Sequence, residues 1–413
     1  MAFRFVHTAD IHLDSPLKSL ALRNQTLAEE VETATRSTFR KIVNLCLDED
    51  IDALLIAGDL YDGEQTSIKT AGFLSGELRR LSEAGVYVCI IRGNHDARAK
   101  ITDKLDLPEK VKNFGARTAE TLVIENQNGP TIAINGLSFP NRHVPENLLR
   151  KYPSPTNDAV NIGMLHTSLA GADGHDVYAP CSVQELIDHG YDYWALGHIH
   201  KRQVHSEKPF VVMPGIPQGR HINEAGPKSV TLITVGNDKS LTIEERFLAT
   251  TAFMPIHITV SGSWSDARVA AESALKNAAE GCCSERLIAR LHIEANDNLS
   301  WQLRRDSDLF LEELNSASGS VAWIEKIDIS KSTSTPSGPI SRIAELMQQK
   351  NAEIALKAEA INMLNDLVRL LPPHARDALG DSETEQMKLA EELASDGIAD
   401  ALARLSAMDE DRQ

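Results

Sequence analysis

Acidic, amide and imidazole side chains recur in the first half of this sequence, each time at the end of an apolar run. Oxygen ligands mixed with imidazole nitrogens suit Mn²⁺, Fe²⁺ or Zn²⁺ better than the all-oxygen sites that Ca²⁺ and Mg²⁺ prefer. Two pairs are spaced by two residues, which places both side chains on the same side of an extended segment. The candidate metal ligands, in chain order, are Asp10, His12, Asp59, Asn94, His166, His198 and His200.

Two divalent ions would give these side chains a definite chemistry. Ions about 3.5–4 Å apart can stabilise both the attacking and the leaving oxygen of a phosphoryl group and can activate a water near neutral pH. Asp59 lies between the two groups of ligands in the chain, so we expect its carboxylate to bridge the ions. His95 adjoins Asn94, and we expect it to donate a proton or to stabilise a phosphate oxygen. Asp96 could hold the His95 imidazole in one tautomer.

The apolar runs before these residues predict the strands of a helix-covered sheet. Residues 52–57 and 86–91 are continuous apolar runs, typical of strands that are buried on both faces. Residues 24–48 read as a helix before the first run, and residues 70–83 as a helix before the second. Further short strands are expected at 121–125, 131–135, 162–165, 193–196 and 210–213, with a hairpin over 229–247. We therefore predict an α/β domain of two stacked sheets flanked by helices, with the ligands converging beyond the strand ends.

The pattern changes after residue 250 and predicts additional parts. We expect one helix over 303–314 inside a small α+β domain, and two C-terminal helical stretches that pack either on a partner or on this chain's own core. The expected division is a metal-binding domain over 1–250, an α+β capping domain over 251–330, a Ser/Thr/Pro/Gly linker over 331–339 and a helical region over 340–413.

The composition favours a soluble globular protein, with 42% hydrophobic and 24% charged residues. The sequence has no run of 18 apolar residues and enters a strand pattern at its start, so we expect a cytoplasmic protein without a membrane span. Five cysteines without a CxxC pair argue against a disulfide framework. The net charge of −17 weighs against a nucleic-acid partner, although two dications would add positive charge that this count omits.

The ordered motifs DxH, GD, GNHD, H and GHxH resemble those of the calcineurin-like metallophosphoesterase superfamily. The segments ADIHLDSPL, AGDLYDG, RGNHD, LHTSLAG, LGHIHK and MPGIPQGR are more similar still to the SbcD/YhaO-type DNA repair exonucleases. Over residues 1–250 the amino-acid motifs themselves are similar, whereas over residues 251–413 only the arrangement of domains is similar. Asp14 occupies a position where the SbcD branch commonly has glycine. The YhaO-like branch shares the sequence Leu13-Asp14-Ser15-Pro16.

This resemblance implies two overlapping ligand sets that share Asp59, one made of Asp10, His12, Asp59 and His200 and the other of Asp59, Asn94, His166 and His198. It implies that His95 is the catalytic histidine and that the metal is Mn²⁺. It also implies a homodimer with 3′–5′ exonuclease and endonuclease activity. Finally, the resemblance implies a capping domain that contacts DNA. It also implies a C-terminal segment that docks an SMC-like ATPase of the SbcC/YhaN type.

Cationic residues near the ligands are candidates for contacts to DNA phosphates. Lys201 and Arg202 follow His200, and Arg220 lies a little further on; the alternative is ordinary solvated charge. We expect a two-metal DNA nuclease acting in repair. A phosphatase or cyclic-nucleotide phosphodiesterase on the same fold is the first alternative, because a fold does not fix the substrate. A non-catalytic scaffold for an SMC-like ATPase is the second, and the complete ligand set speaks against it.

Overall fold

The chain folds into two compact units. The computed structural model describes residues 2–15, 33–61, 67–97, 107–126, 129–169, 178–319, 322–330, 340–351, 354–370 and 383–410. One unit comprises Met1–Phe253 with Cys282–Arg286, and the other comprises Met254–Gly281 with Leu287–Gln413. The expected linker at 331–339 and the first part of the expected helix, at 24–32, lie outside the described residues.

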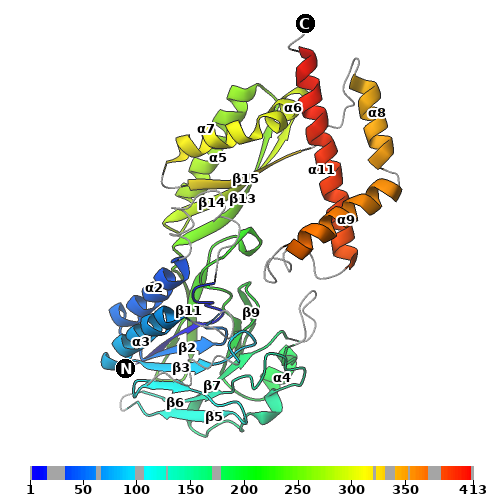
Figure 1. The fold of residues 1–413 in the computed structure, drawn as a ribbon. Helices are drawn as coiled ribbons and strands as arrows, with labels where there is room; N and C mark the ends of the chain where they lie inside the picture. Colours follow the sequence, from blue (N-terminus) through cyan, green and yellow to red (C-terminus); the bar gives the residue numbers. More distant parts are fainter. Residues whose placement is uncertain are drawn as a thin grey trace. The chain divides into compact units, whose positions relative to one another are not determined.

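The first unit begins with a six-stranded sheet in the order β12-β11-β1-β2-β3-β4. Strands β1 to β4 run parallel to one another, and the predicted hairpin adds the antiparallel strands β11 and β12 on the other side of β1. The strands are β1 (Phe3–Thr8), β2 (Ala53–Ala57), β3 (Tyr87–Ile91), β4 (Val111–Asn113), β11 (Ser229–Val235) and β12 (Leu241–Phe247). Helices α2 (Ala34–Asp48) and α3 (Ile68–Glu83) cover one face of this sheet (Figure 1).

A second six-stranded sheet, in the order β5-β6-β7-β8-β10-β9, packs against the first. Its parallel centre is formed by β6, β7, β8 and β10. The strands are β5 (Glu120–Ile124), β6 (Thr131–Gly136), β7 (Ala159–His166), β8 (Tyr193–Gly197), β9 (Gln203–Glu207) and β10 (Phe210–Met213). Helix α4 (Val183–Asp188) contributes Leu186 to a separate core on the outer side of this sheet.

Alternation along the strands explains the continuous apolar runs. Leu55 and Cys89 point into the core between the two sheets, whereas Leu54, Ile56 and Val88 point into the core beneath the helices. Both faces of β2 and β3 are therefore buried, and neither strand has room for a polar residue before its end. The predicted arrangement of two stacked sheets flanked by helices is confirmed.

The second unit is built on a three-stranded sheet in the order β13-β14-β15, with a core shared with three helices. The elements are β13 (Thr251–Val260), α5 (Trp264–Glu280), β14 (Arg286–Ala295), α6 (Asp297–Arg305), α7 (Ser307–Ser318) and β15 (Ala322–Ile329). The single helix predicted over 303–314 is wrong, because the chain turns at Asp306. This residue leaves the helical backbone region, with φ −112° and ψ 31°, and separates α6 from α7.

The C-terminal helices α8 (Ile340–Asn351), α9 (Ile354–Leu370) and α11 (Glu383–Glu410) belong to the same unit. Trp301 of α6 packs with Ile398 and Leu402 of α11, and Arg304 forms an ion pair of 2.7 Å with Asp400. Of the two alternatives, packing within this chain is the one that the structure contains. Among the residues that the structure describes, no helix is both long and apolar enough to span a membrane.

Candidate metal centre

The candidate ligands lie on loops at the ends of strands from both sheets of the first unit. Asp10, Asp59 and Asn94 follow β1, β2 and β3, while the four histidines come from the loop after β1, the end of β7 and the loop after β8. Four candidate ligands have a left-handed backbone, with φ of 53° at Asp10, 47° at His12, 50° at Asp59 and 101° at His198. Such conformations cost about 1–3 kcal/mol each in non-glycine residues and cluster at functional sites.

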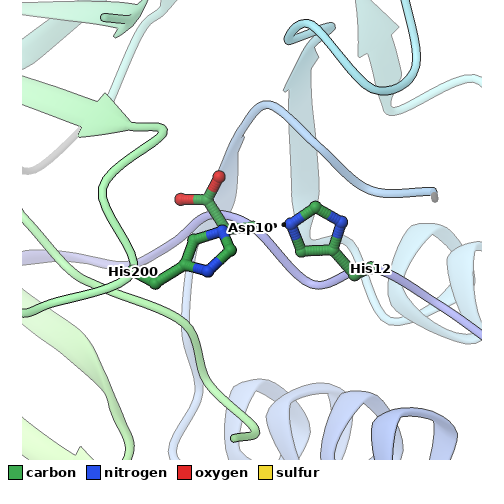
Figure 2. Close-up of side chains that lie close together, drawn as sticks. All are labelled: Asp10, His12 and His200. Atoms are coloured by element: carbon green, nitrogen blue, oxygen red, sulfur yellow. Dashed lines mark hydrogen bonds between the residues drawn. The ribbon is translucent and has the colours of Figure 1, made fainter. Parts of the chain in front are cut away.

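The first cluster consists of Asp10, His12 and His200, whose ligand atoms all lie within 4.8 Å of one another. Figure 2 shows these three side chains close together, with the His12 ring facing the His200 ring. The Nε2 atoms of His12 and His200 are 3.2 Å apart. Ligands at about 2.1 Å from a metal are roughly 3.0–3.4 Å apart at octahedral or tetrahedral angles. The spacing of the two imidazoles therefore fits a shared divalent ion.

The second cluster consists of Asp59, His166 and His198, again with ligand atoms within 4.8 Å of one another. The carboxamide oxygen of Asn94 joins them, 3.0 Å from Nε2 of His166 and 3.1 Å from Nδ1 of His198. Nε2 of His166 also lies 3.4 Å from the Asp59 carboxylate. The structure thus brings all the predicted ligands into two adjacent groups whose chemistry and spacing suit a pair of divalent ions.

Burial makes the charges of this site depend on one another. Asp10, His12 and His166 are fully buried and Asp59 is 1% exposed. Burial alone would lower the pKa of His166, but the Asp59 and Asp10 carboxylates raise it to about 9. Burial acts to raise the pKa of Asp59, yet His166 and His12 hold it well below its usual range. In the metal-free site a proton on His166 therefore supplies positive charge that a bound metal would replace.

Three glycines leave the space that the His166 imidazole occupies. A Cβ atom on Gly58 would lie 2.3 Å from Nδ1 of His166, and one on Gly93 would lie 2.3 Å from the Asp59 carboxylate and 2.6 Å from the imidazole. A Cβ atom on Gly197 would lie 2.1 Å from the backbone oxygen of Ala57. The glycine before each ligand in the GD, GN and GH motifs is thus required by close packing of the ligand loops.

His95 and Asp96 lie on the turn that carries Asn94. The backbone N–H of His95 donates to Asp59 at 2.9 Å, and the His95 ring lies edge-on to His12 with centroids 4.9 Å apart. The Asp96 carboxylate accepts backbone N–H groups from Gly93 at 2.7 Å and from Leu60 at 2.9 Å. These bonds join the loop after β2 to the loop after β3. Burial and the nearby Asp59 raise the pKa of Asp96 to about 7.

The three cationic residues predicted near the site have different environments. Arg220 donates to Glu224 at 2.7 Å, and Arg202 donates to Thr231 and lies 3.4 Å from Glu245. Lys201 is exposed. Both arginines therefore have acidic partners within this chain and are only partly exposed, which leaves Lys201 as the most accessible of the three to a phosphate.

Glu224 is a site residue that the sequence did not reveal. Its carboxylate accepts a 2.7 Å hydrogen bond from Nδ1 of His200 and is 8% exposed. Burial acts to raise the pKa of Glu224, but the bonds from His200 and Arg220 hold it well below its usual range. The only signal in the sequence was an acidic residue four positions after Arg220, which is common on any surface.

Comparison with known proteins agrees with this geometry. Residues 3–202 match the calcineurin-like phosphoesterase family, and residues 253–332 match the middle domain of metallophosphoesterase YhaO.

The chain is 38% identical over 234 residues to the uncharacterized metallophosphoesterase YhaO of Bacillus subtilis, covering 56% of this chain and 57% of that protein. It is 26% identical over 239 residues to the DNA double-strand break repair protein Mre11 of Methanopyrus kandleri, covering 52% and 49% of the two chains. It is 25% identical over 281 residues to the SbcD component of the SbcCD nuclease of Bacillus subtilis, covering 60% and 70%.

Among solved structures, the chain matches TT1561 of Thermus thermophilus, with a TM-score of 0.34 and 15% identity, covering 59% of this chain and 99% of that one. A dimetal phosphatase from Danio rerio has a TM-score of 0.33 and 12% identity, covering 60% of this chain and 98% of that one.

The chain therefore carries, over residues 3–202, a domain that matches the calcineurin-like phosphoesterase family. More narrowly, it is homologous to the YhaO, SbcD and Mre11 proteins and shares the middle domain of YhaO. The matched region spans about half the length of the YhaO and Mre11 relatives.

Proposed function

We propose that the protein is a two-metal-dependent DNA nuclease, with 3′–5′ exonuclease and endonuclease activity, that acts in DNA repair. The observation that carries the hydrolytic part of this proposal is the pair of adjacent ligand clusters with His95 beside them. DNA as the substrate is supported by the relatives, among them a protein named as part of a nuclease and another named as a double-strand break repair protein.

The candidate ligands would hold two divalent ions, for which we propose Mn²⁺. Bound ions of this kind stabilise the charge that develops on phosphoryl oxygens and lower the pKa of water. We assign the Asp59 carboxylate to both clusters, because it lies 3.4 Å from Nε2 of His166 and its charge also acts on His12. His95 would donate a proton to the leaving oxygen, and Asp96 would fix the turn that carries it.

The remaining proposals concern partners. Lys201 is exposed directly after His200, where it could contact a DNA phosphate. Helix α9 presents apolar side chains at i, i+4 and i+7, namely Met363, Leu367 and Leu370, which are 69%, 48% and 84% exposed. We propose that this face docks an SMC-like ATPase of the SbcC/YhaN type. We also propose that the protein acts as a homodimer.

The substrate test compares two phosphoesters under the same conditions. The purified full chain loaded with Mn²⁺ is incubated with an end-labelled linear DNA duplex and, separately, with a nitrophenyl phosphomonoester. We expect Mn²⁺-dependent shortening of the DNA from its 3′ ends, and loss of that activity in EDTA. Hydrolysis of the monoester without any cleavage of DNA would contradict the nuclease proposal and support the phosphatase alternative.

A further inference from the structure

The imidazole of His200 has close partners at both of its nitrogens. Its Nε2 lies 3.2 Å from Nε2 of His12, within the first metal cluster. Its Nδ1 lies 2.7 Å from the Glu224 carboxylate, on the opposite side of the ring. With a metal on Nε2, the ring proton must reside on Nδ1, where it donates to Glu224. The carboxylate thus selects the tautomer and fixes the plane of the ring.

Glu224 is itself held in place. The backbone N–H of Arg220 donates to its Oε2 at 2.8 Å, and the Arg220 guanidinium donates to its Oε1 at 2.7 Å. The side chains of Glu224 and Arg220 are 6% and 14% exposed. A carboxylate with so little contact with water needs these partners, because an unpaired buried charge is strongly destabilising. The Arg220 guanidinium therefore compensates the charge of the Glu224 carboxylate and holds it in place.

The segment that carries Glu224 is also anchored at its other end by Gln218, which is 1% exposed. The Gln218 side-chain oxygen accepts bonds from the Thr38 hydroxyl and from the Thr250 backbone, both at 3.0 Å. Its amide nitrogen donates to the Thr251 backbone at 2.8 Å. In addition, the N–H of Ile216 donates to the backbone oxygen of His200 at 3.1 Å. Hydrogen bonds thus hold the segment that carries Glu224 against the loop that carries His200.

We infer that Glu224, held by Arg220, is a positioning residue that orients His200 and selectively strengthens metal binding at the Asp10–His12–His200 cluster. The second cluster takes only His198 from the loop that carries His200, because Asp59, Asn94 and His166 come from the ends of other strands. The inference rests on the metal assignments proposed above and not on DNA as the substrate. It also gives Arg220 a role inside the protein in place of the predicted contact with a DNA phosphate.

The test measures metal binding at each site of the full chain. The variants Glu224→Gln and Glu224→Ala are titrated with Mn²⁺ by equilibrium dialysis, and the bound metal is counted by elemental analysis. Loss of a carboxylate that orients a metal-bound histidine typically weakens metal binding about 10–100-fold. We expect that loss for one of two Mn²⁺ ions, a smaller loss in Glu224→Gln than in Glu224→Ala, and little change for the other ion. Electron paramagnetic resonance, at a Mn²⁺ concentration that just fills both wild-type sites, should then show isolated ions in the variant where the wild type shows a coupled pair.

Glu77 provides the matched control. It is 6% exposed in the same unit and pairs with Arg40 at 3.2 Å and with Arg80, but it lies on α3 and touches no candidate ligand. Glu77→Gln should bind two Mn²⁺ ions as the wild type does. Equal weakening of both ions in Glu224→Gln, unchanged binding of both, or the same loss in Glu77→Gln would overturn the inference. If Glu224→Ala does not fold, the Mn²⁺ titrations of Glu224→Gln and Glu224→Asp test the inference in its place. A wild type that binds two Mn²⁺ ions but never cleaves DNA would reject the nuclease and leave this inference intact.

Discussion

The carboxamide oxygen of Asn94 lies 3.0 Å from Nε2 of His166, although the two residues are 72 positions apart and belong to loops of different sheets. Asn94 follows β3 of the first sheet, and His166 ends β7 of the second. Packing of the two sheets against each other therefore assembles the site, and neither sheet alone carries a complete ligand cluster. Stability of the core between the sheets and affinity for metal should be linked, because a ligand that binds only the folded state stabilises it.

Metal binding should release protons. His166, with its pKa raised to about 9, is protonated at neutral pH in the metal-free site, and a metal can bind its Nε2 only after that proton leaves. We expect uptake of Mn²⁺ at pH 7 to acidify a weakly buffered solution, and affinity to rise with pH by up to about tenfold per unit for each proton released. Calorimetry in buffers of different ionisation enthalpy measures the number of protons. Binding without proton release at pH 7 would show that His166 is already neutral before the metal binds.

Gly93→Ala should damage the second cluster. The added methyl group would lie 2.3 Å from the Asp59 carboxylate and 2.6 Å from the His166 imidazole, so both ligands would have to move. We expect loss of at least one Mn²⁺ ion and a decrease in the free energy of unfolding of about 1–3 kcal/mol, as for other overpacked cores. Gly72→Ala on α3 is the control, since nothing lies within 4 Å of its added atom. It should keep both metals and, by helix propensity, gain up to about 1 kcal/mol.

His95→Ala should separate catalysis from metal binding. His95 lies on the Asn94 turn with its ring beside His12, and neither metal cluster includes it. We expect both Mn²⁺ ions to remain and kcat to fall about 10²–10⁴-fold, the usual contribution of a general acid. Elemental analysis and single-turnover cleavage measure the two quantities on the same sample. Loss of metal in this variant would make His95 a ligand.

The sequence predicted the strands and ligand loops well, for a physical reason. The strands of the core between the sheets are buried on both faces, so their apolar runs are unbroken and stop where the ligand loops begin. Strands β4 and β9 escaped prediction: Val111–Asn113 is only three residues long, and Gln203–Glu207 is an edge strand that is largely exposed and has no apolar alternation. The partnership of Glu224 with His200 also escaped, because it joins residues 24 positions apart through a turn that no periodicity reveals.

His7 should make the unfolding free energy depend on pH in acid. It is buried between the sheets, where it contacts the Tyr193 hydroxyl and the Leu196 backbone oxygen, both at 3.0 Å. Burial lowers the pKa of His7 from 6.5 to about 3. Above pH 6.5 the imidazole is neutral in both the folded and the unfolded chain, so it adds no pH dependence to the free energy of unfolding. Between pH 6.5 and 3 only the unfolded chain gains this proton, so stability falls by about 1.4 kcal/mol per pH unit as the pH decreases.

The comparison of His7→Gln with the wild type isolates this contribution from those of other titrating groups. Urea unfolding in EDTA at pH 7, 6, 5 and 4 gives the free energy of unfolding for both proteins. We expect the difference between them to shrink as the pH falls, because the variant lacks the buried imidazole. Parallel pH profiles would show that His7 is protonated in the folded state.

A crystal structure of the Mn²⁺-loaded protein, with anomalous scattering data, would show whether two metal ions share this site. We predict two anomalous peaks about 3.5–4 Å apart, the separation of two-metal hydrolases. One peak should contact Asp10, His12 and His200, the other should contact Asn94, His166 and His198, and the Asp59 carboxylate should lie between them. A single peak, or two peaks that do not share Asp59, would show that the site does not hold a bridged pair of metal ions.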